Sequence, residues 1–216
     1  MYLDGCDSLD DATTAEFVHE LSFALRLSEL HLVRLKLGQK TMHQLAVLMK
    51  NMLNQRHDQQ EFLLKFRCCD FEALVNQDLK LKFPTFNILE NHLVPLSCLS
   101  LANCNITDPT LDAIKPRLSQ LEFLDLGYNR FSFERLVRFL EEIGSIRHQD
   151  KPKLRQLNIA GNLLAVDEQS IGSRICKALQ EIIRCTFLTH LDLSYTGLSI
   201  QAATQCMEAM KNARSV

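Results

Sequence analysis

The sequence is poor in residues that make tight turns, with only 7 glycines and 5 prolines among its 216 residues. This scarcity argues against an all-β sandwich and against a disordered chain. No apolar run approaches the length that spans a bilayer, and the N-terminus lacks the basic and apolar regions of a secretory signal. The formal net charge of -2 gives no reason to expect nucleic acid or an anionic membrane surface as a partner.

The patterns of metal and catalytic sites are also missing. Eight cysteines are present, but there is no C-x-x-C pair, and the histidines lack the H-x(3-5)-H spacing of zinc sites. There is no G-x-S-x-G, P-loop, H-E-x-x-H or dinucleotide-binding glycine motif. We therefore expect no enzymatic activity, no metal and no cofactor, with reduced, mostly buried thiols in a cytoplasmic protein. The alternative is an enzyme in which Cys68 and His31 share one surface.

What the sequence does contain is a leucine string that recurs along its whole length. Residues 96–106 read L-x-x-L-x-L-x-x-C-x-I, and side-chain alternation puts the leucines on one buried face of an extended segment. Copies aligned on the second leucine of this template lie 25 to 35 residues apart. The seven anchors are Met1, Leu30, Leu64, Leu99, Leu124, Leu157 and Leu191. With 46% hydrophobic residues the chain can bury one core, so residues 1–216 are expected to form one domain.

These strings resemble the leucine-rich repeat family, whose signature is L-x-x-L-x-L-x-x-N/C-x-L. Apolar positions at helical spacing follow most copies, and Ser132 and Gly144 are expected to begin and end one such helix. Long helices on a period near 30 are similar to the ribonuclease-inhibitor-like subfamily. The resemblance implies an α/β fold, a right-handed βα superhelix of about seven repeats, with a parallel sheet on the concave face and helices on the convex face.

Two copies depart from this pattern. In the fourth copy Pro116 allows barely two helical turns, and the third is followed by an irregular stretch expected between residues 80 and 95. The polar connection 147–153 is expected to be exposed. Neither end shows a polar cap, so either a partner or a second copy covers the ends, or the chain is a fragment of a longer protein.

The non-leucine residues of the strands identify the candidate site, because alternation turns them toward the concave face. Exposed aromatic residues flanked by charges are typical of binding hot spots. A basic cluster (Arg34, Lys65 and Arg67) and an acidic, aromatic half indicate a partner of mixed charge, and Phe123 is exposed unless the register differs. The candidate protein-binding residues are His31, Arg34, Lys65, Arg67, Phe123, Asp125, Tyr128, Arg130, Asn158, His190, Asp192 and Tyr195.

The sequence thus predicts a non-enzymatic module that grips a folded protein on its concave face. The subfamily resemblance implies that the partner is an enzyme whose active site is covered, so that binding inhibits or regulates it. Small stand-alone repeat proteins of this kind are also similar to effectors that intracellular bacteria deliver into host cells. The alternative function is the recognition arm or scaffold of a larger sensor or actin-regulating protein.

Overall fold

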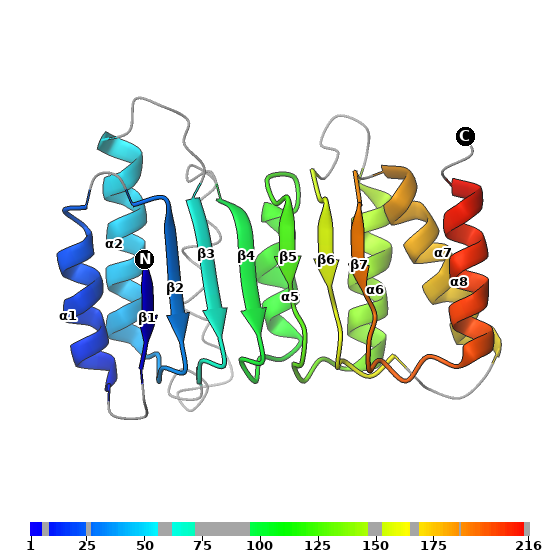
Figure 1. The fold of residues 1–216 in the computed structure, drawn as a ribbon, viewed down its shortest axis with the longest axis horizontal. Helices are drawn as coiled ribbons and strands as arrows, with labels where there is room; N and C mark the ends of the chain where they lie inside the picture. Colours follow the sequence, from blue (N-terminus) through cyan, green and yellow to red (C-terminus); the bar gives the residue numbers. More distant parts are fainter. Residues whose placement is uncertain are drawn as a thin grey trace.

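The computed structural model describes residues 1–5, 9–24, 27–55, 62–71, 96–146, 153–164, 169–185 and 187–213. Seven strands form one parallel sheet in the order of the chain, so each strand pairs with the next (Figure 1). The strands are β1 (Tyr2–Asp4), β2 (Glu29–Val33), β3 (Phe62–Arg67), β4 (Leu96–Ala102), β5 (Phe123–Asp125), β6 (Gln156–Asn158) and β7 (His190–Asp192).

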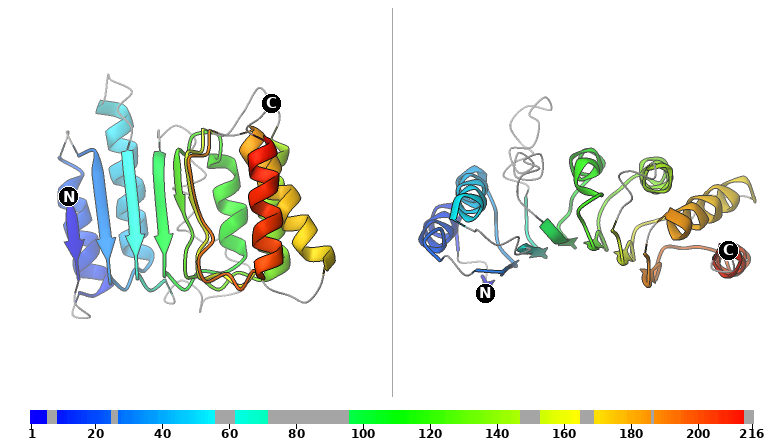
Figure 2. Two further views of the ribbon diagram at one scale, coloured as in Figure 1. Left: turned by 45° about the vertical axis from the view of Figure 1, so that its right-hand side comes forward. Right: turned by 90° about the horizontal axis from the view of Figure 1, so that it is seen from above.

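The helices lie on one side of this sheet. They are α1 (Asp11–Leu21), α2 (Gln39–Gln55), α5 (Pro109–Ile114), α6 (Phe133–Ser145), α7 (Gln169–Cys185) and α8 (Ile200–Ala213), with a 3₁₀ turn, η2 (Lys115–Arg117), after α5. Seen along the strands, the strands follow the inner side of an arc and the helices its outer side (Figure 2). This arrangement confirms the expected α/β superhelix with a concave sheet face.

The core lies between the sheet and the helices and is built from the repeated leucines. Leu30, Leu64, Leu99, Leu124 and Leu157 occupy the same register position on five neighbouring strands and are at most 1% exposed. Each strand alone has one bare apolar face, so burial requires the neighbouring repeat. The apolar faces of α2, α6 and α7 close this core, with Leu45, Leu140 and Ile182 fully buried, whereas Met207 on α8 is 53% exposed.

The burial of both Leu96 and Leu99 requires an irregularity in β4. Leu96 and Leu99 are three residues apart, so a regular strand would turn them to opposite faces. Both are fully buried, because Phe62 pairs with Leu96 while Leu63 pairs with Cys98. A bulge at Ser97 therefore shifts the register by one residue.

The helix boundaries follow the predicted signals except at one end. Ser132 caps α6, and its side chain accepts a hydrogen bond from Arg135 N at 3.4 Å. The expectation that Gly144 ends α6 is wrong, since the helix continues to Ser145. A Cβ on Gly144 would lie 2.8 Å from Cβ of Glu181 on α7, so this glycine permits close packing of two helices. As expected, α5 is short and is followed by the turn that contains Pro116.

Besides Asn105 and Gly197, one residue at an equivalent position after each described strand from β2 to β7 has a left-handed backbone. These residues are Arg34, Cys68, Asn103, Tyr128, Gly161 and Tyr195, with φ between 51° and 67°. The first five donate their amide hydrogen to a carbonyl of the next repeat, at N–O distances of 2.6 to 3.0 Å. The hydrogen bonds offset part of the cost of this conformation, which is about 1–2 kcal/mol for a residue with a Cβ.

In the repeats of β5 and β6 the next residue is an asparagine whose side chain hydrogen-bonds the backbone groups of the turn. Asn162 is 1% exposed, and its amide donates to the carbonyls of Leu126, Ile159 and Ala160 at 2.9, 3.1 and 3.3 Å. Its Oδ1 accepts the amide hydrogen of Asn129 at 3.2 Å, and Asn129 makes the corresponding bonds one repeat earlier. One side chain therefore joins two repeats, which is why an asparagine suits this position.

Two expectations fall outside the described residues, namely those for residues 80–95 and for the connection 147–152. Among the helices that the structure describes, none combines the length and apolar character needed to cross a bilayer.

Replacing Asn162 by alanine is expected to lower the free energy of unfolding by about 3 kcal/mol or more, because several buried backbone groups lose their partners. Urea unfolding measures the effect. Arg138→Ala on the exposed face of α6 is the control and should change stability by about 0.5 kcal/mol or less. Equal stability of the two variants would contradict the bridging role of Asn162.

Candidate functional site

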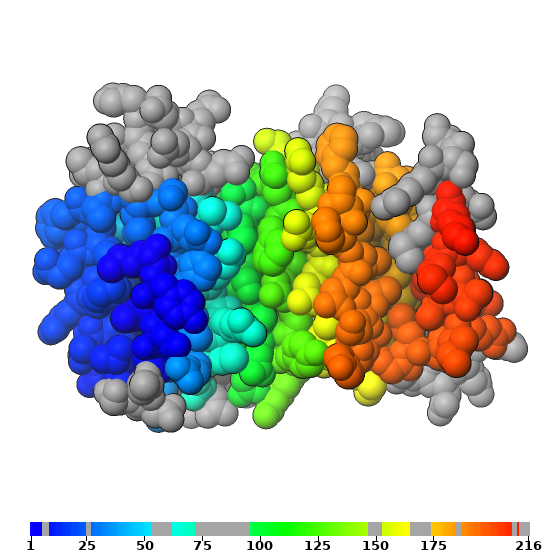
Figure 3. Space-filling model, in the orientation of Figure 1, coloured from blue at the N-terminus to red at the C-terminus, as the bar shows by residue number. Residues whose placement is uncertain are grey.

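The candidate site is the concave face of the sheet, which faces the viewer in Figure 3. Strand register aligns one outward residue from each strand into a row across this face. This central row consists of Tyr2, His31, Lys65, Ser100, Asp125, Asn158 and Asp192. The left-handed residues form a second row at the carboxyl ends of the strands. The predicted Arg34, Tyr128 and Tyr195 belong to this row.

In the N-terminal half of this face the charges are paired. Arg34 Nε and Nη2 donate to the two carboxylate oxygens of Asp4, both at 2.8 Å. Lys65 Nζ donates to Oε1 of Glu29 at 2.9 Å, and Nε2 of His31 lies 2.6 Å from the same oxygen. These two hydrogen bonds lower the pKa of the Glu29 carboxyl to about 2.

The expected basic cluster is therefore not a free basic surface. Two of its three members, Arg34 and Lys65, are neutralised by carboxylates from neighbouring strands. Arg67 is exposed at the end of β3. The sequence pattern did not reveal these pairs, because Asp4 and Arg34 are 30 positions apart.

The C-terminal half is different, because Asp125 and Asp192 have no ion pair among the described residues. Asp125 Oδ1 accepts the amide hydrogen of Gly127 at 3.0 Å, and Oδ2 accepts the hydroxyl hydrogen of Ser100 at 3.2 Å. Asp192 Oδ1 accepts the amide hydrogen of Ser194 at 2.9 Å, and this contact lowers the pKa of the Asp192 carboxyl. Asn158 makes the equivalent bond with Ala160. Both carboxyl groups thus lie on the concave face without a cationic partner among the described residues.

Two tyrosines meet at the carboxyl end of this half. The ring centroids of Tyr128 and Tyr195 lie 6.3 Å apart with 44° between the ring planes. Tyr128 is 50% exposed and Tyr195 is 82% exposed, although they come from repeats that are not adjacent. The repeat between them contributes Gly161, where a Cβ would lie 2.3 Å from Cδ1 of Tyr128. The absence of a side chain at Gly161 therefore leaves room for the ring of Tyr128.

The other predicted residues lie around this pair without joining it. Phe123 is half-buried on β5, in register with Cys98 and Gln156, so it is partly accessible. His190 is exposed, and its Nδ1 lies 2.9 Å from Oγ1 of Thr189. Arg130 is exposed beyond the strand, where its backbone amide donates to Ile106.

Sequence reasoning missed Gly161, Asp4 and Glu29. The signal for Gly161 was available in the aligned repeats, which read Asp125-Leu-Gly-Tyr128, Asn158-Ile-Ala-Gly161 and Asp192-Leu-Ser-Tyr195. A glycine at the position where the repeats on both sides carry tyrosine indicates that the rings share its space.

The described cysteines are free thiols, and Cys68 is the exposed one among them. Its sulfur accepts a hydrogen bond from Nδ2 of Asn103 at 3.4 Å, whereas His31 contacts Glu29. Burial raises the pKa of the Cys98 thiol to about 11, and a hydrogen bond with Cys69 together with burial raises the pKa of Cys104. The described contacts therefore do not join Cys68 and His31 as a nucleophile and its base.

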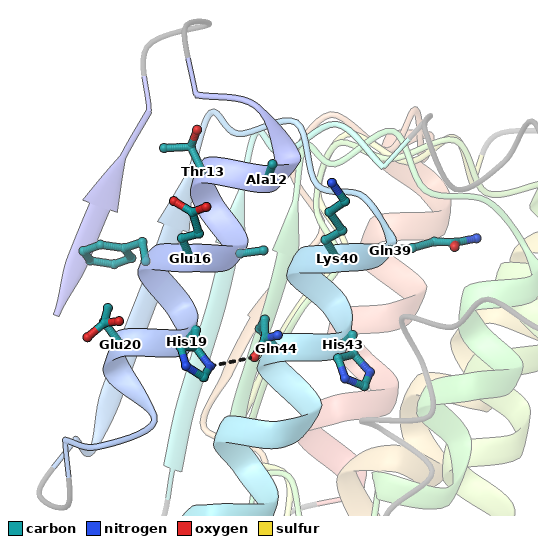
Figure 4. A pocket seen from close by; sticks show the side chains of 11 residues that line it. Ala12, Thr13, Glu16, His19, Glu20, Gln39, Lys40, His43 and Gln44 are labelled. Atoms are coloured by element: carbon teal, nitrogen blue, oxygen red, sulfur yellow. Dashed lines mark hydrogen bonds between the residues drawn. The ribbon is translucent and has the colours of Figure 1, made fainter.

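A shallow groove of about 1130 Å³ lies between α1 and α2, on the helical side of the molecule (Figure 4). Glu16 and His19 of α1 and Lys40 and Gln44 of α2 line it, and His19 Nδ1 lies 3.3 Å from Oε1 of Gln44. Within the described ranges no three metal-binding side chains converge on one point. None of the predicted site residues lines this groove.

The sheet, its outer helices and the repeated turns define the fold of a leucine-rich repeat solenoid. A family model described as a leucine-rich repeat matches residues 184–199, which contain β7. These findings support a leucine-rich repeat protein.

Comparison with individual proteins gives only distant likenesses. No curated protein matches the sequence. A Caenorhabditis elegans tropomodulin C-terminal domain is similar in structure, with 14% identity, a TM-score of 0.47 and 93% of each chain covered. A structure of actin-binding site 2 of leiomodin-1 has 16% identity and a TM-score of 0.43, covering 61% of this chain and 71% of the other.

Thiol labelling at neutral pH is expected to show a rapidly labelled cysteine that Cys68→Ser removes, since Cys68 is exposed. Its rate should be no faster than that of an unhindered small-molecule thiol, because the described contacts supply no base. Labelling of Cys68 many times faster than this reference would instead support the enzyme alternative.

Gly161→Ala is expected to lower the free energy of unfolding by about 2 kcal/mol, from the positive φ and the contact with the Tyr128 ring. The loss should be smaller in a Tyr128→Ala background, where the ring no longer blocks the methyl group. Gly127→Ala is the matched control, since its Cβ would meet neighbours only at 3.2 Å or more. Purely additive losses in urea unfolding would show that Tyr128 does not occupy this space.

Proposed function

We propose that the protein is a non-enzymatic binding module that grips a folded protein partner on its concave face. The observation that carries this proposal is the exposed tyrosine pair, Tyr128 and Tyr195, held outward on that face. Tyrosine is enriched among the residues that dominate binding energy, since it buries a large area at a small cost in side-chain entropy. Solenoids also offer their curved inner surface over several repeats at once.

The surrounding residues fit the same role. The concave face combines ion-paired side chains at β1 to β3 with small residues on β4, where Cys98 and Ser100 are buried. A polar rim around aromatic anchors is the usual composition of a protein interface. Arg67, Phe123, Arg130, Asn158 and His190 complete the proposed contact surface.

The finer predictions concern what binding does. Binding inhibits an enzyme partner if the covered surface includes its active site. We predict this regulatory function from the resemblance to ribonuclease-inhibitor-like proteins. Origin as a delivered bacterial effector, and a cytoplasmic location, also stay predictions. Each requires the partner to be identified.

The alternative is the recognition arm of a larger sensor or actin-regulating protein. Actin binding is a property named for the leiomodin structure, and a likeness of that TM-score gives no argument for transferring it. Purified actin is nevertheless a defined probe. Co-sedimentation with filaments, lost on substitution of concave residues, would favour this alternative over enzyme regulation.

The proposal is tested by capture from a lysate of the source cell, followed by titration of the purified co-eluting protein. The variant Tyr128→Ala/Tyr195→Ala should weaken its affinity by about 10³-fold, since hot-spot residues contribute about 2 kcal/mol or more each and every 1.4 kcal/mol is tenfold. The variant Arg138→Ala/Lys177→Ala removes exposed charges from α6 and α7 on the helical side and should bind normally.

Two results would contradict the concave site. One is unchanged affinity of the tyrosine variant when its urea unfolding matches the wild type. The other is loss of binding on replacing Ile200 and Met207 by serine, with the tyrosine variant unaffected. These apolar side chains of α8 are 87% and 53% exposed, so they offer an alternative binding surface at the C-terminal end of the sheet.

A further inference from the structure

The two halves of the concave face differ in how their negative charges are balanced. Asp4 and Glu29 each have a cationic partner within 2.9 Å on a neighbouring strand. Asp125 and Asp192 receive hydrogen bonds only from neutral groups among the described residues. A partner that covers the C-terminal half must therefore supply positive charge, because an uncompensated carboxylate is costly to bury.

The same half contains a sequence element that occurs twice. Repeats five and seven read Asp-Leu-x-Tyr, as Asp125 to Tyr128 and as Asp192 to Tyr195, while repeat six reads Asn158-Ile-Ala-Gly161. Strand pairing places Asp125, Asn158 and Asp192 side by side, so the two carboxyl groups stand about 10 Å apart, at two strand spacings. The middle repeat has the uncharged Asn158 and no side chain at Gly161. It therefore leaves both outer repeats, with their aspartates and tyrosines, accessible to one ligand group.

The tyrosine rings add a second attraction for a cation. The face of a tyrosine ring attracts an ammonium or guanidinium group that lies within about 6 Å of its centroid. With centroids 6.3 Å apart and planes inclined by 44°, a cation resting over the junction of the rings reaches both. The 82% exposure of Tyr195 leaves this approach open from the concave side.

We propose that the Tyr128–Tyr195 pair, with the carboxylates of Asp192 and Asp125, binds a lysine or arginine side chain of the protein partner. This inference rests on the proposed function and names the chemistry that the partner presents to the C-terminal half of the concave face. Among the described residues no ion pair joins Asp125 or Asp192 to a cationic side chain of the chain itself, and Arg155 is paired with Glu122 at 3.3 Å.

A fluorine NMR titration tests this inference without knowledge of the partner. The protein has 3 tyrosines and no tryptophan, so labelling with 3-fluorotyrosine gives one resonance each for Tyr2, Tyr128 and Tyr195. Tyr→Phe variants assign them. The probe is acetyl-Gly-Arg-Gly-amide, with the lysine peptide as a second cation and the citrulline peptide as an uncharged control of the same shape.

The cationic peptides are expected to shift the Tyr128 and Tyr195 resonances with millimolar saturation, leaving Tyr2 unmoved, while citrulline has little effect. Asp192→Asn and Asp125→Asn should each weaken the titration at least threefold. Glu208→Gln, which removes one negative charge from the exposed side of α8, should not change it. Equal shifts with citrulline, no shift with either cation, or no effect of the aspartate variants would each overturn the cation site.

The two proposals fail separately. If Tyr128→Ala/Tyr195→Ala abolishes partner binding but cations do not shift the tyrosine resonances, the concave site stands and its cation specificity is wrong. If cations bind as expected while the captured partner ignores the tyrosine substitution, the cation site exists but the proposed function is wrong.

Discussion

The structure depends on one recurring constraint: after each of the strands β2 to β7 the chain passes through a residue with a left-handed backbone at an equivalent position of the repeat. This turn carries an energetic cost for every residue except glycine. Hydrogen bonds offset it, since the amide of each such residue from Arg34 to Gly161 donates to the following repeat. The side chains of Asn129 and Asn162 then fill the turn beneath. Stability and curvature thus come from contacts between neighbouring repeats.

The same constraint arranges the surface. The left-handed residues lie at the rim of the concave face. From Arg34 to Tyr195, each repeat can therefore carry a different residue at this position with the same backbone conformation. In the N-terminal repeats this position contributes to an ion pair with Asp4, and in the C-terminal repeats it contributes aromatic rings. Binding chemistry can therefore change along the sheet without any change in the way the repeats pack.

Much of this was predictable because it is local. The spacing of leucines predicted the strands and the apolar helix faces, and Ser132 was correctly predicted to begin α6. The bulge at Ser97 and the continuation of α6 past Gly144 were not predictable in this way. Both arise from packing against a neighbouring repeat, Phe62 in the first case and Glu181 in the second.

By itself, then, the sequence determined the repeat and the fold class, because period and alternation act over a few positions. The positions of Arg34, Tyr128 and Tyr195 depend in addition on the left-handed turns after the strands. Tertiary structure decided which of these residues act together. The pairs Arg34–Asp4 and Lys65–Glu29, and the contact of Tyr128 with Tyr195 across Gly161, join residues 30 or more positions apart. Only the stacking of repeats brings such residues together, so the charge balance of the face follows from the fold.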